Sequence, residues 1–183
     1  MAQRYYLPAF LIISACALRV SRHFGVIDLP PNFAPIGGLA LFAGAVFERR
    51  VFAVMFPLTA MAVSDLFIGF YDAPIMAAVY GSFIISVLLG RYIQARPSFI
   101  RIVGSSLVSS TVFFLITNFA VWLFSGMYLP DISGLEQALL MGTPFFKWTL
   151  AGDLFYTGVL FGLWYFVLFV AKFCKRANII IEI

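Results

Sequence analysis

The segment from Ser21 to Pro35 holds the densest group of side chains that could bind a ligand. It places the only histidine of the chain, His23, close to a carboxylate, Asp28, and a carboxamide, Asn32. Together these groups can donate and accept hydrogen bonds, and the imidazole can change its charge near neutral pH. The segment therefore predicts ligand recognition, although Asn32 could instead cap the helix that Pro35 begins.

Two further carboxylates fall inside apolar stretches. Asp65 lies near the end of one stretch, and Asp153 lies a turn or two into another. An ionisable side chain inside a membrane span is costly, so by default it indicates a functional site. The alternative is a structural ion pair. Asp65 could pair with Arg19 or Arg22, and Asp153 with Lys147.

The remaining candidates are aromatic side chains and one amide near the ends of apolar stretches. Asn118 and Trp122 are four residues apart and share one helix face. The amide favours a pocket wall, whereas Trp122 alone would be typical of the aromatic belt at a membrane surface. Both interpretations also apply to other aromatic residues near this level, which are Tyr71, Tyr80, Phe145 and Trp148.

No catalytic or metal-binding signature accompanies these residues. A single histidine excludes a paired-histidine zinc motif, and the sequence contains neither a G-x-S-x-G elbow nor a G-x-x-x-x-G-K phosphate loop. The two cysteines, Cys16 and Cys174, lie at opposite ends of the chain without metal-ligand spacing. We expect no catalytic residue, no metal and no resident cofactor.

Composition indicates the environment in which these residues must be positioned. Of 183 residues, 63% are hydrophobic and 11% are charged, and the mean hydropathy is +1.02. A soluble domain has about 25% charged residues, so a soluble enzyme, a nucleic-acid-binding domain and a disordered regulator are excluded. We predict one all-α integral membrane domain over residues 1–183, with the lipid bilayer and a small molecule as partners and no nucleic acid.

We predict six transmembrane helices, over about residues 5–20, 35–47, 51–70, 74–93, 100–124 and 146–173. A weaker apolar piece, 134–141, predicts an interfacial helix on a long loop. In this arrangement nine of the 12 Lys and Arg residues lie on the same side of the membrane as the N-terminus. The positive-inside rule therefore predicts that both termini are cytoplasmic. Most carboxylates fall on the other side, which favours a polar site that opens outward.

Two short motifs lie in the first two predicted helices. The small residues Gly37, Ala40 and Gly44 predict a close contact between helices. The sequence from Ile13 to Cys16 resembles a lipoprotein processing site, whose cleavage would remove the first helix. The single positive charge upstream and the six-span charge pattern favour an uncleaved helix.

Several motifs in this order resemble a family of known architecture. They are Asn32–Phe42, Ser64-Asp65-Leu66 with Gly69-Phe70, Val79-Tyr80, Thr117–Trp122, Pro144-Phe145-Phe146 and Gly152-Asp153-Leu154. From about Pro30 to Gly162 the chain resembles small bacterial inner-membrane proteins related to the substrate-binding S components of ECF-type vitamin transporters. The cobalamin-specific BtuM proteins are the nearest relatives of known function.

The resemblance implies six helices with both termini inside, a vitamin bound near the outer face, and partners that comprise a coupling membrane subunit and ATPases. In BtuM-like proteins a histidine and a carboxylate face the corrin, and His23 and Asp65 match these in position. A cysteine of the fourth helix that binds cobalt has no counterpart over Ala77–Tyr80. This difference argues against cobalt–thiolate coordination and leaves cobalamin as one candidate for the transported ligand.

We therefore expect a substrate-binding subunit that captures a small ring-containing ligand in one outward-facing pocket. The predicted pocket residues are His23, Asp28, Asn32, Asp65, Tyr71, Tyr80, Asn118, Trp122, Phe145 and Asp153. The seven principal members exclude Asp28, Tyr71 and Phe145. At least four of the seven should line one cavity, and fewer would favour the structural alternative over a binding protein. The alternatives are a membrane enzyme, with His23 as a general base oriented by Asp65, and a structural membrane protein without a ligand.

Overall fold

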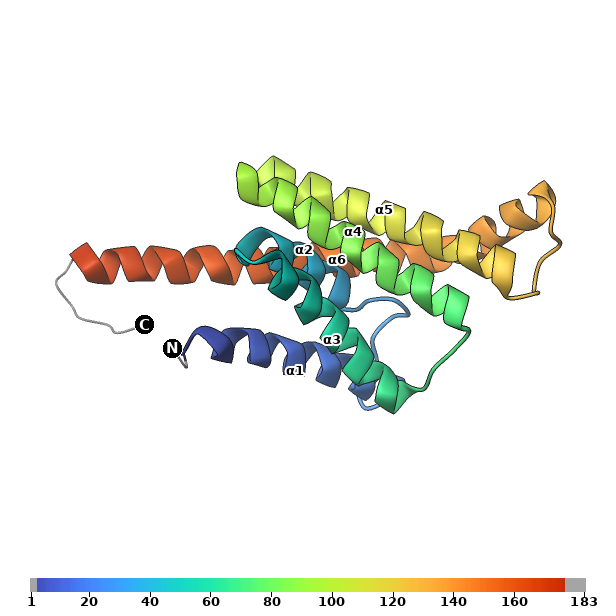
Figure 1. Cartoon of the computed structure of the whole chain (residues 1–183), viewed down its shortest axis with the longest axis horizontal. Coiled ribbons are helices and arrows are strands. Elements are labelled where there is room, and N and C mark those ends of the chain that lie inside the picture. Colours follow the sequence, from blue (N-terminus) through green and yellow to red (C-terminus); the bar gives the residue numbers. More distant parts are fainter. Residues whose placement is uncertain (1–2, 177–183) are drawn as a thin grey trace.

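The computed structural model describes the backbone of residues 3–176 and the side chains of residues 10–173. Every regular element in this range is an α-helix, which confirms the predicted all-α class. In chain order they are α1 (Gln3–His23), α2 (Ile36–Val46), α3 (Arg50–Ile68), α4 (Ala73–Ala95), α5 (Phe99–Phe124) and α6 (Ile132–Arg176) (Figure 1). Four of them, α3 to α6, are long and apolar enough to cross a membrane. Their length and composition indicate a membrane protein.

The helices run back and forth along one long axis. α1, α3 and α5 begin at the end of the bundle where α4 and α6 finish (Figure 1). Arg49 precedes α3, Arg91 lies near the end of α4, and Arg101 lies near the start of α5. Basic residues that the sequence assigned to one side of the membrane thus gather at one end of the bundle, here called the basic end.

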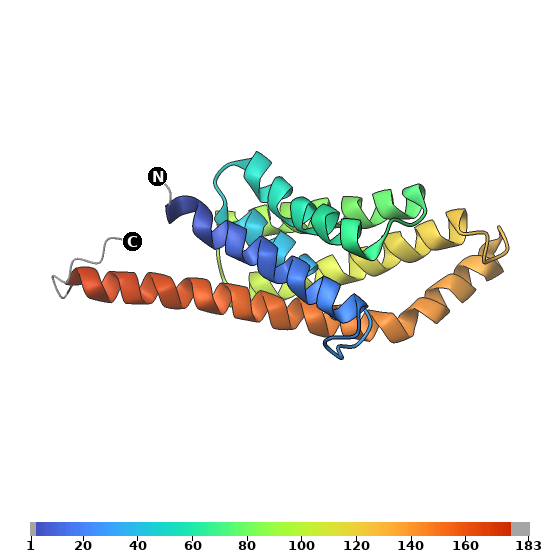
Figure 2. The same cartoon turned by 90° about the horizontal axis from the view of Figure 1, so that it is seen from below.

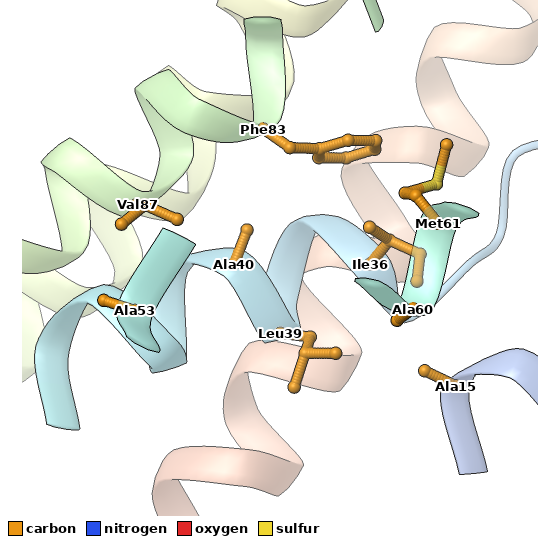
Figure 3. Close-up of a cluster of buried hydrophobic side chains, with 9 residues drawn as sticks. All are labelled: Ala15, Ile36, Leu39, Ala40, Ala53, Ala60, Met61, Phe83 and Val87. Atoms are coloured by element: carbon orange, nitrogen blue, oxygen red, sulfur yellow. The ribbon is translucent and has the colours of Figure 1, made fainter. Parts of the chain in front are cut away.

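α2 is the central helix of the bundle. All residues from Ile36 to Gly44 are buried, and α2 contacts α3, α4, α5 and α6. Figure 3 shows Ile36, Leu39 and Ala40 of α2 beside buried side chains of α1, α3 and α4. A helix that is apolar all round belongs in an interior, so the sequence of α2 explains its position.

α2 crosses α4 at a contact between two glycines. A Cβ atom added at Gly44 would overlap the carbonyl oxygen of Val87, and one added at Gly90 would lie 2.8 Å from the Cα of Gly44. Small residues allow two backbones to approach this closely, which stabilises helix pairs in lipid. The close contact predicted for Gly44 is confirmed. Gly37 instead faces the side chain of Asp153 on α6.

The sixth helix differs from the prediction. We expected an interfacial helix over 134–141, separated by a loop from a span over 146–173. The structure instead contains one 45-residue helix, Ile132–Arg176, with Pro144 inside it. Proline removes a backbone hydrogen bond and kinks a helix, and α6 bends in its N-terminal part (Figure 2). The separation of the two segments was wrong because the proline bends this helix without ending it.

Candidate functional site

A cavity of about 280 Å³ lies at the end of the bundle opposite the basic end. It is lined by the end of α1, by residues 32–35 of the loop before α2, and by α2 to α6. The short central helix explains why this space exists. α2 has 11 residues and is about 16 Å long, whereas α4 has 23 and is about 35 Å long. α2 therefore fills only part of the bundle interior.

Asp153 of α6 lies at the inner end of the cavity, here called the floor. Its side chain is 6% exposed. Ser110 of α5 donates a hydrogen bond to its Oδ2 atom at 2.6 Å, and the backbone N–H of Gly38 donates a second one. The carboxylate thus meets the N-terminal turn of α2, where the helix dipole favours a negative charge. Glycine at 37 leaves room for it, because a Cβ atom there would overlap the carboxylate.

Hydroxyl groups surround Asp153 at the floor. Ser86 of α4 and Ser109 of α5 are hydrogen-bonded to each other at 2.6 Å, and both line the cavity with Thr149 of α6. All three are buried. Because a buried polar group is costly without a partner, these hydroxyls make the floor a fixed polar surface between apolar walls.

The walls of the cavity are mainly aromatic and aliphatic. Phe33 comes from the loop before α2, Val79 and Phe83 from α4, and Phe113 from α5. The rings of Phe83 and Phe113 lie 5.4 Å apart. An apolar cavity with a few fixed polar groups is typical of a small-molecule site.

A buried ion pair lies beside the cavity. Arg19 of α1, which lines the cavity, binds Oδ1 of Asp65 at 3.0 Å, and Tyr80 of α4 donates to Oδ2 at 2.7 Å. Arg19 also donates to Ser64. Asp65 is 1% exposed and does not line the cavity. The structural alternative for Asp65, a pair with Arg19, is the one that the structure contains.

The outer end of the cavity, here called the mouth, carries polar and basic groups. It includes Arg22 and His23 at the end of α1, Asn32 in the loop, and Tyr71 between α3 and α4. Arg22 donates from Nε to the carbonyl oxygen of Leu29 at 3.0 Å. Partial burial raises the pKa of Tyr71 above its ordinary value, and the Asp65 carboxylate raises it further. The Tyr71 phenol therefore stays protonated and can donate a hydrogen bond.

Asn32 has a backbone role that the sequence analysis did not predict. Its φ of 64° is left-handed, which asparagine tolerates better than most residues. The N–H of Phe33 donates to the carbonyl oxygen of Pro30, which closes a turn around Asn32. The residue that precedes the first helical residue of α2 is Pro35, and no side chain there caps the helix. The capping role considered for Asn32 is therefore wrong.

The cavity gathers part of the predicted pocket. His23, Asn32 and Asp153 line it, together with Tyr71 from the wider set. Three of the seven principal members meet there, fewer than the four that we required. Asp65, Tyr80, Asn118, Trp122, Asp28 and Phe145 do not line it.

The two predicted residues of α5 serve the hairpin between α5 and α6 instead. Asn118 donates from its side chain to the carbonyl oxygen of Phe114 and packs against Gly142. Trp122 donates to the carbonyl oxygen of Leu129 at 2.9 Å. The ion pair considered between Asp153 and Lys147 is not formed, because Lys147 lies over the ring of Trp148. In the described part of the chain, no group of three or more His, Cys, Asp or Glu residues could hold a metal ion.

Comparisons with known proteins identify the family and nothing narrower. The profile of a family of unknown function, DUF6580, matches residues 1–176, so the chain belongs to that family. Neither the curated proteins nor the solved structures contain a significant match.

Proposed function

We propose that this protein is the substrate-binding membrane subunit of a vitamin- or cofactor-type, ECF-like transporter, which captures a small ring-containing ligand in the cavity above α2. The observation that carries the proposal is the cavity itself, with Asp153 at its floor and Arg22 at its mouth inside an otherwise apolar bundle. Protein interiors are close-packed, and an unfilled space costs stability. A bundle with only a structural role would fill this space with side chains.

The proposal includes the orientation of the protein in the membrane. The chain would cross the bacterial inner membrane six times, with the basic end in the cytoplasm as the positive-inside rule requires. α1 and α2 would supply the two spans beyond the four long apolar helices. In this orientation the mouth of the cavity faces outward, where a substrate arrives.

The size of the cavity supports a ligand smaller than cobalamin. A volume of about 280 Å³ is just below the range of about 300–1,000 Å³ for drug-sized molecules. A corrin with its nucleotide loop is much larger than such a molecule. A single ring or a fused pair of rings with polar substituents fits this volume.

Release of the ligand toward the cytoplasm would need movement of the bundle. On the basic side of α2, a cluster of buried apolar side chains fills the interior, formed by Leu41, Phe42, Ile93, Ile102 and Phe161. The rings of Phe42 and Phe161 pack edge to face at 5.4 Å. Rocking or toppling of the whole bundle would bypass this cluster. The sequence lacks a phosphate-binding loop, so ATPases and a coupling membrane subunit would supply the energy.

The test is mass spectrometry of small molecules that co-purify with the detergent-solubilised protein. We expect one compound to be enriched, chemically unchanged and in stoichiometric amount. Val79→Trp adds bulk at a cavity-lining position of α4 and should remove it, whereas Ile84→Trp at an exposed position of the same helix should retain it. An empty wild-type protein, or equal retention in both variants, would contradict the proposal.

A further inference from the structure

We propose that the ligand is a small dipolar molecule, with a cationic nitrogen that binds Asp153 at the floor and an anionic group that binds Arg22 at the mouth. This inference rests on the proposed function and names the chemical class of its substrate. It follows from one acidic and one basic side chain that line the same cavity and that form no ion pair with any side chain of residues 10–173.

The floor carries a carboxyl group without a basic partner. Among the side chains of residues 10–173, no Arg, Lys or His forms an ion pair with Asp153. The N–H of Gly38 and the hydroxyl of Ser110 each donate a hydrogen bond to its oxygens. A cationic group of the ligand would supply the opposite charge that this buried carboxyl group lacks.

The carboxylate has acceptor positions to spare. A carboxylate offers about four positions for hydrogen bonds, and the contacts with Ser110 and Gly38 fill two of them. Because Asp153 also lines the cavity, the ligand can reach it. An N–H donor on a positive charge is the strongest complement to such an acceptor, and an anionic group at this point would be repelled.

The mouth carries the opposite charge. Arg19 and Arg22 both line the cavity, but Asp65 neutralises Arg19 alone. Arg22 uses its Nε for the carbonyl oxygen of Leu29, and within residues 10–173 it forms no ion pair. Its two terminal nitrogens can therefore hold an anionic group in a two-point contact, as guanidinium groups do with carboxylates.

The aromatic walls specify the rest of the ligand. Phe33, Phe83 and Phe113 line the cavity, so a flat ring would be buried against them. A ligand with a ring and two opposite charges would complement both Asp153 and Arg22. Asp153 is the more selective contact, because it is buried whereas Arg22 is partly in water, where an ion pair is weaker.

The test uses three probes with the same ring: 4-(aminomethyl)benzoate, which carries the two charges at opposite ends of the ring, benzylamine, which carries only the positive one, and benzoate, which carries only the negative one. Binding is measured by calorimetry with the detergent-solubilised full chain, alongside mass spectrometry of the compound retained from the cell. We expect that compound to be dipolar. We also expect 4-(aminomethyl)benzoate to bind most tightly and benzoate most weakly.

Two variants separate the contributions of the two charges. Asp153→Asn keeps the shape of the side chain and should weaken the binding of 4-(aminomethyl)benzoate and benzylamine at least about tenfold, the effect of losing a charge-assisted hydrogen bond. Arg22→Gln should weaken 4-(aminomethyl)benzoate about two- to fivefold and leave benzylamine unchanged. Glu136→Gln, at an exposed site on α6, is the control and should change none of these affinities.

The outcomes distinguish this inference from the proposed function. A retained compound that is uncharged or purely anionic, or one whose retention is unchanged in Asp153→Asn, would overturn the dipolar ligand and leave the binding function in place. A wild-type protein that retains no compound and binds no probe would overturn both. If Asp153→Asn fails to fold, the affinity order of the probes and the effect of Arg22→Gln still show whether the cavity selects a dipolar ligand.

Discussion

Asp153 of α6 and Arg91 of α4 contact opposite ends of the same short helix. The carboxylate of Asp153 accepts a hydrogen bond from Gly38 at the start of α2. The guanidinium of Arg91 donates to the carbonyl oxygens of Phe47 and Glu48, just after its end. A helix carries partial positive charge at its N-terminus and partial negative charge at its C-terminus. Side chains from other helices thus stabilise both ends of α2, which has no side-chain cap of its own.

Removal of Arg91 should loosen the C-terminal end of α2. Arg91→Ala leaves the carbonyl oxygens of Phe47 and Glu48 without a charged donor, so we expect a loss of about 1–3 kcal/mol of stability. The measurement is the thermal midpoint of the protein in detergent. Arg96→Ala, which removes an exposed arginine at the same end of α4, is the control. Equal midpoints for the two variants would show that Arg91 does not support α2.

The Arg19–Asp65 pair should behave as a structural unit. Arg19→Met or Asp65→Leu alone leaves one charge without its ionic partner beside the cavity, and each should cost about 3–5 kcal/mol. The double variant should recover much of that loss, because replacing both partners of a buried pair is often close to neutral. A double-mutant cycle of folded yield and thermal midpoint measures the coupling. Additive effects would mean that the pair contributes little.

The crossing of α2 and α4 should tolerate no side chain at Gly44. A Cβ there overlaps the backbone of α4 at Val87, so Gly44→Ala should lower the folded yield and Gly44→Leu should prevent folding. Gly104→Ala on α5 is the matched control, since nothing lies within 4 Å of its added Cβ. That variant should be neutral or more stable by up to about 1 kcal/mol. Similar yields for the alanine variants would contradict the close crossing.

The proposed orientation predicts which positions are accessible from outside the cell. In a variant without Cys16 and Cys174, single cysteines at Asp28 and Asp131 should react with a thiol reagent that does not cross the membrane. A cysteine at Arg96, at the basic end, should react only after the membrane is permeabilised. The reverse pattern would invert the topology and place the mouth of the cavity in the cytoplasm.

Much of the fold could be predicted, because the lengths of the apolar stretches and the turn residues between them determine where the helices lie. The predicted span 35–47 corresponds to α2 at Ile36–Val46, and 100–124 to α5 at Phe99–Phe124. The continuity of α6 could not be predicted, because Pro144 is compatible with either a helix end or a bend. Only the surrounding packing decides between the two.

The site was harder to predict than the helices. Position along the chain gives the depth of a residue in the bundle, but not the direction in which its side chain points. Asn118 was expected in the pocket from its depth, yet it packs against Gly142 of α6. Conversely, Ser109 was not among the predicted pocket residues, although it lines the floor. The run of closely spaced serines at 105, 106, 109 and 110 in an apolar helix was the signal that could have found it.

The hydrogen bonds of the floor have a consequence for biosynthesis. Ser86 and Thr149 donate to carbonyl oxygens four residues earlier in their own helices, so each hydroxyl is satisfied as soon as its helix forms. Asp153 depends on Ser110 and Gly38, which lie in α5 and α2. Because the chain is made from its N-terminus, the ribosome has completed both of these helices before α6 emerges. Asp153 is the last member of its own site to be synthesised, and it enters the membrane when its partners are already there.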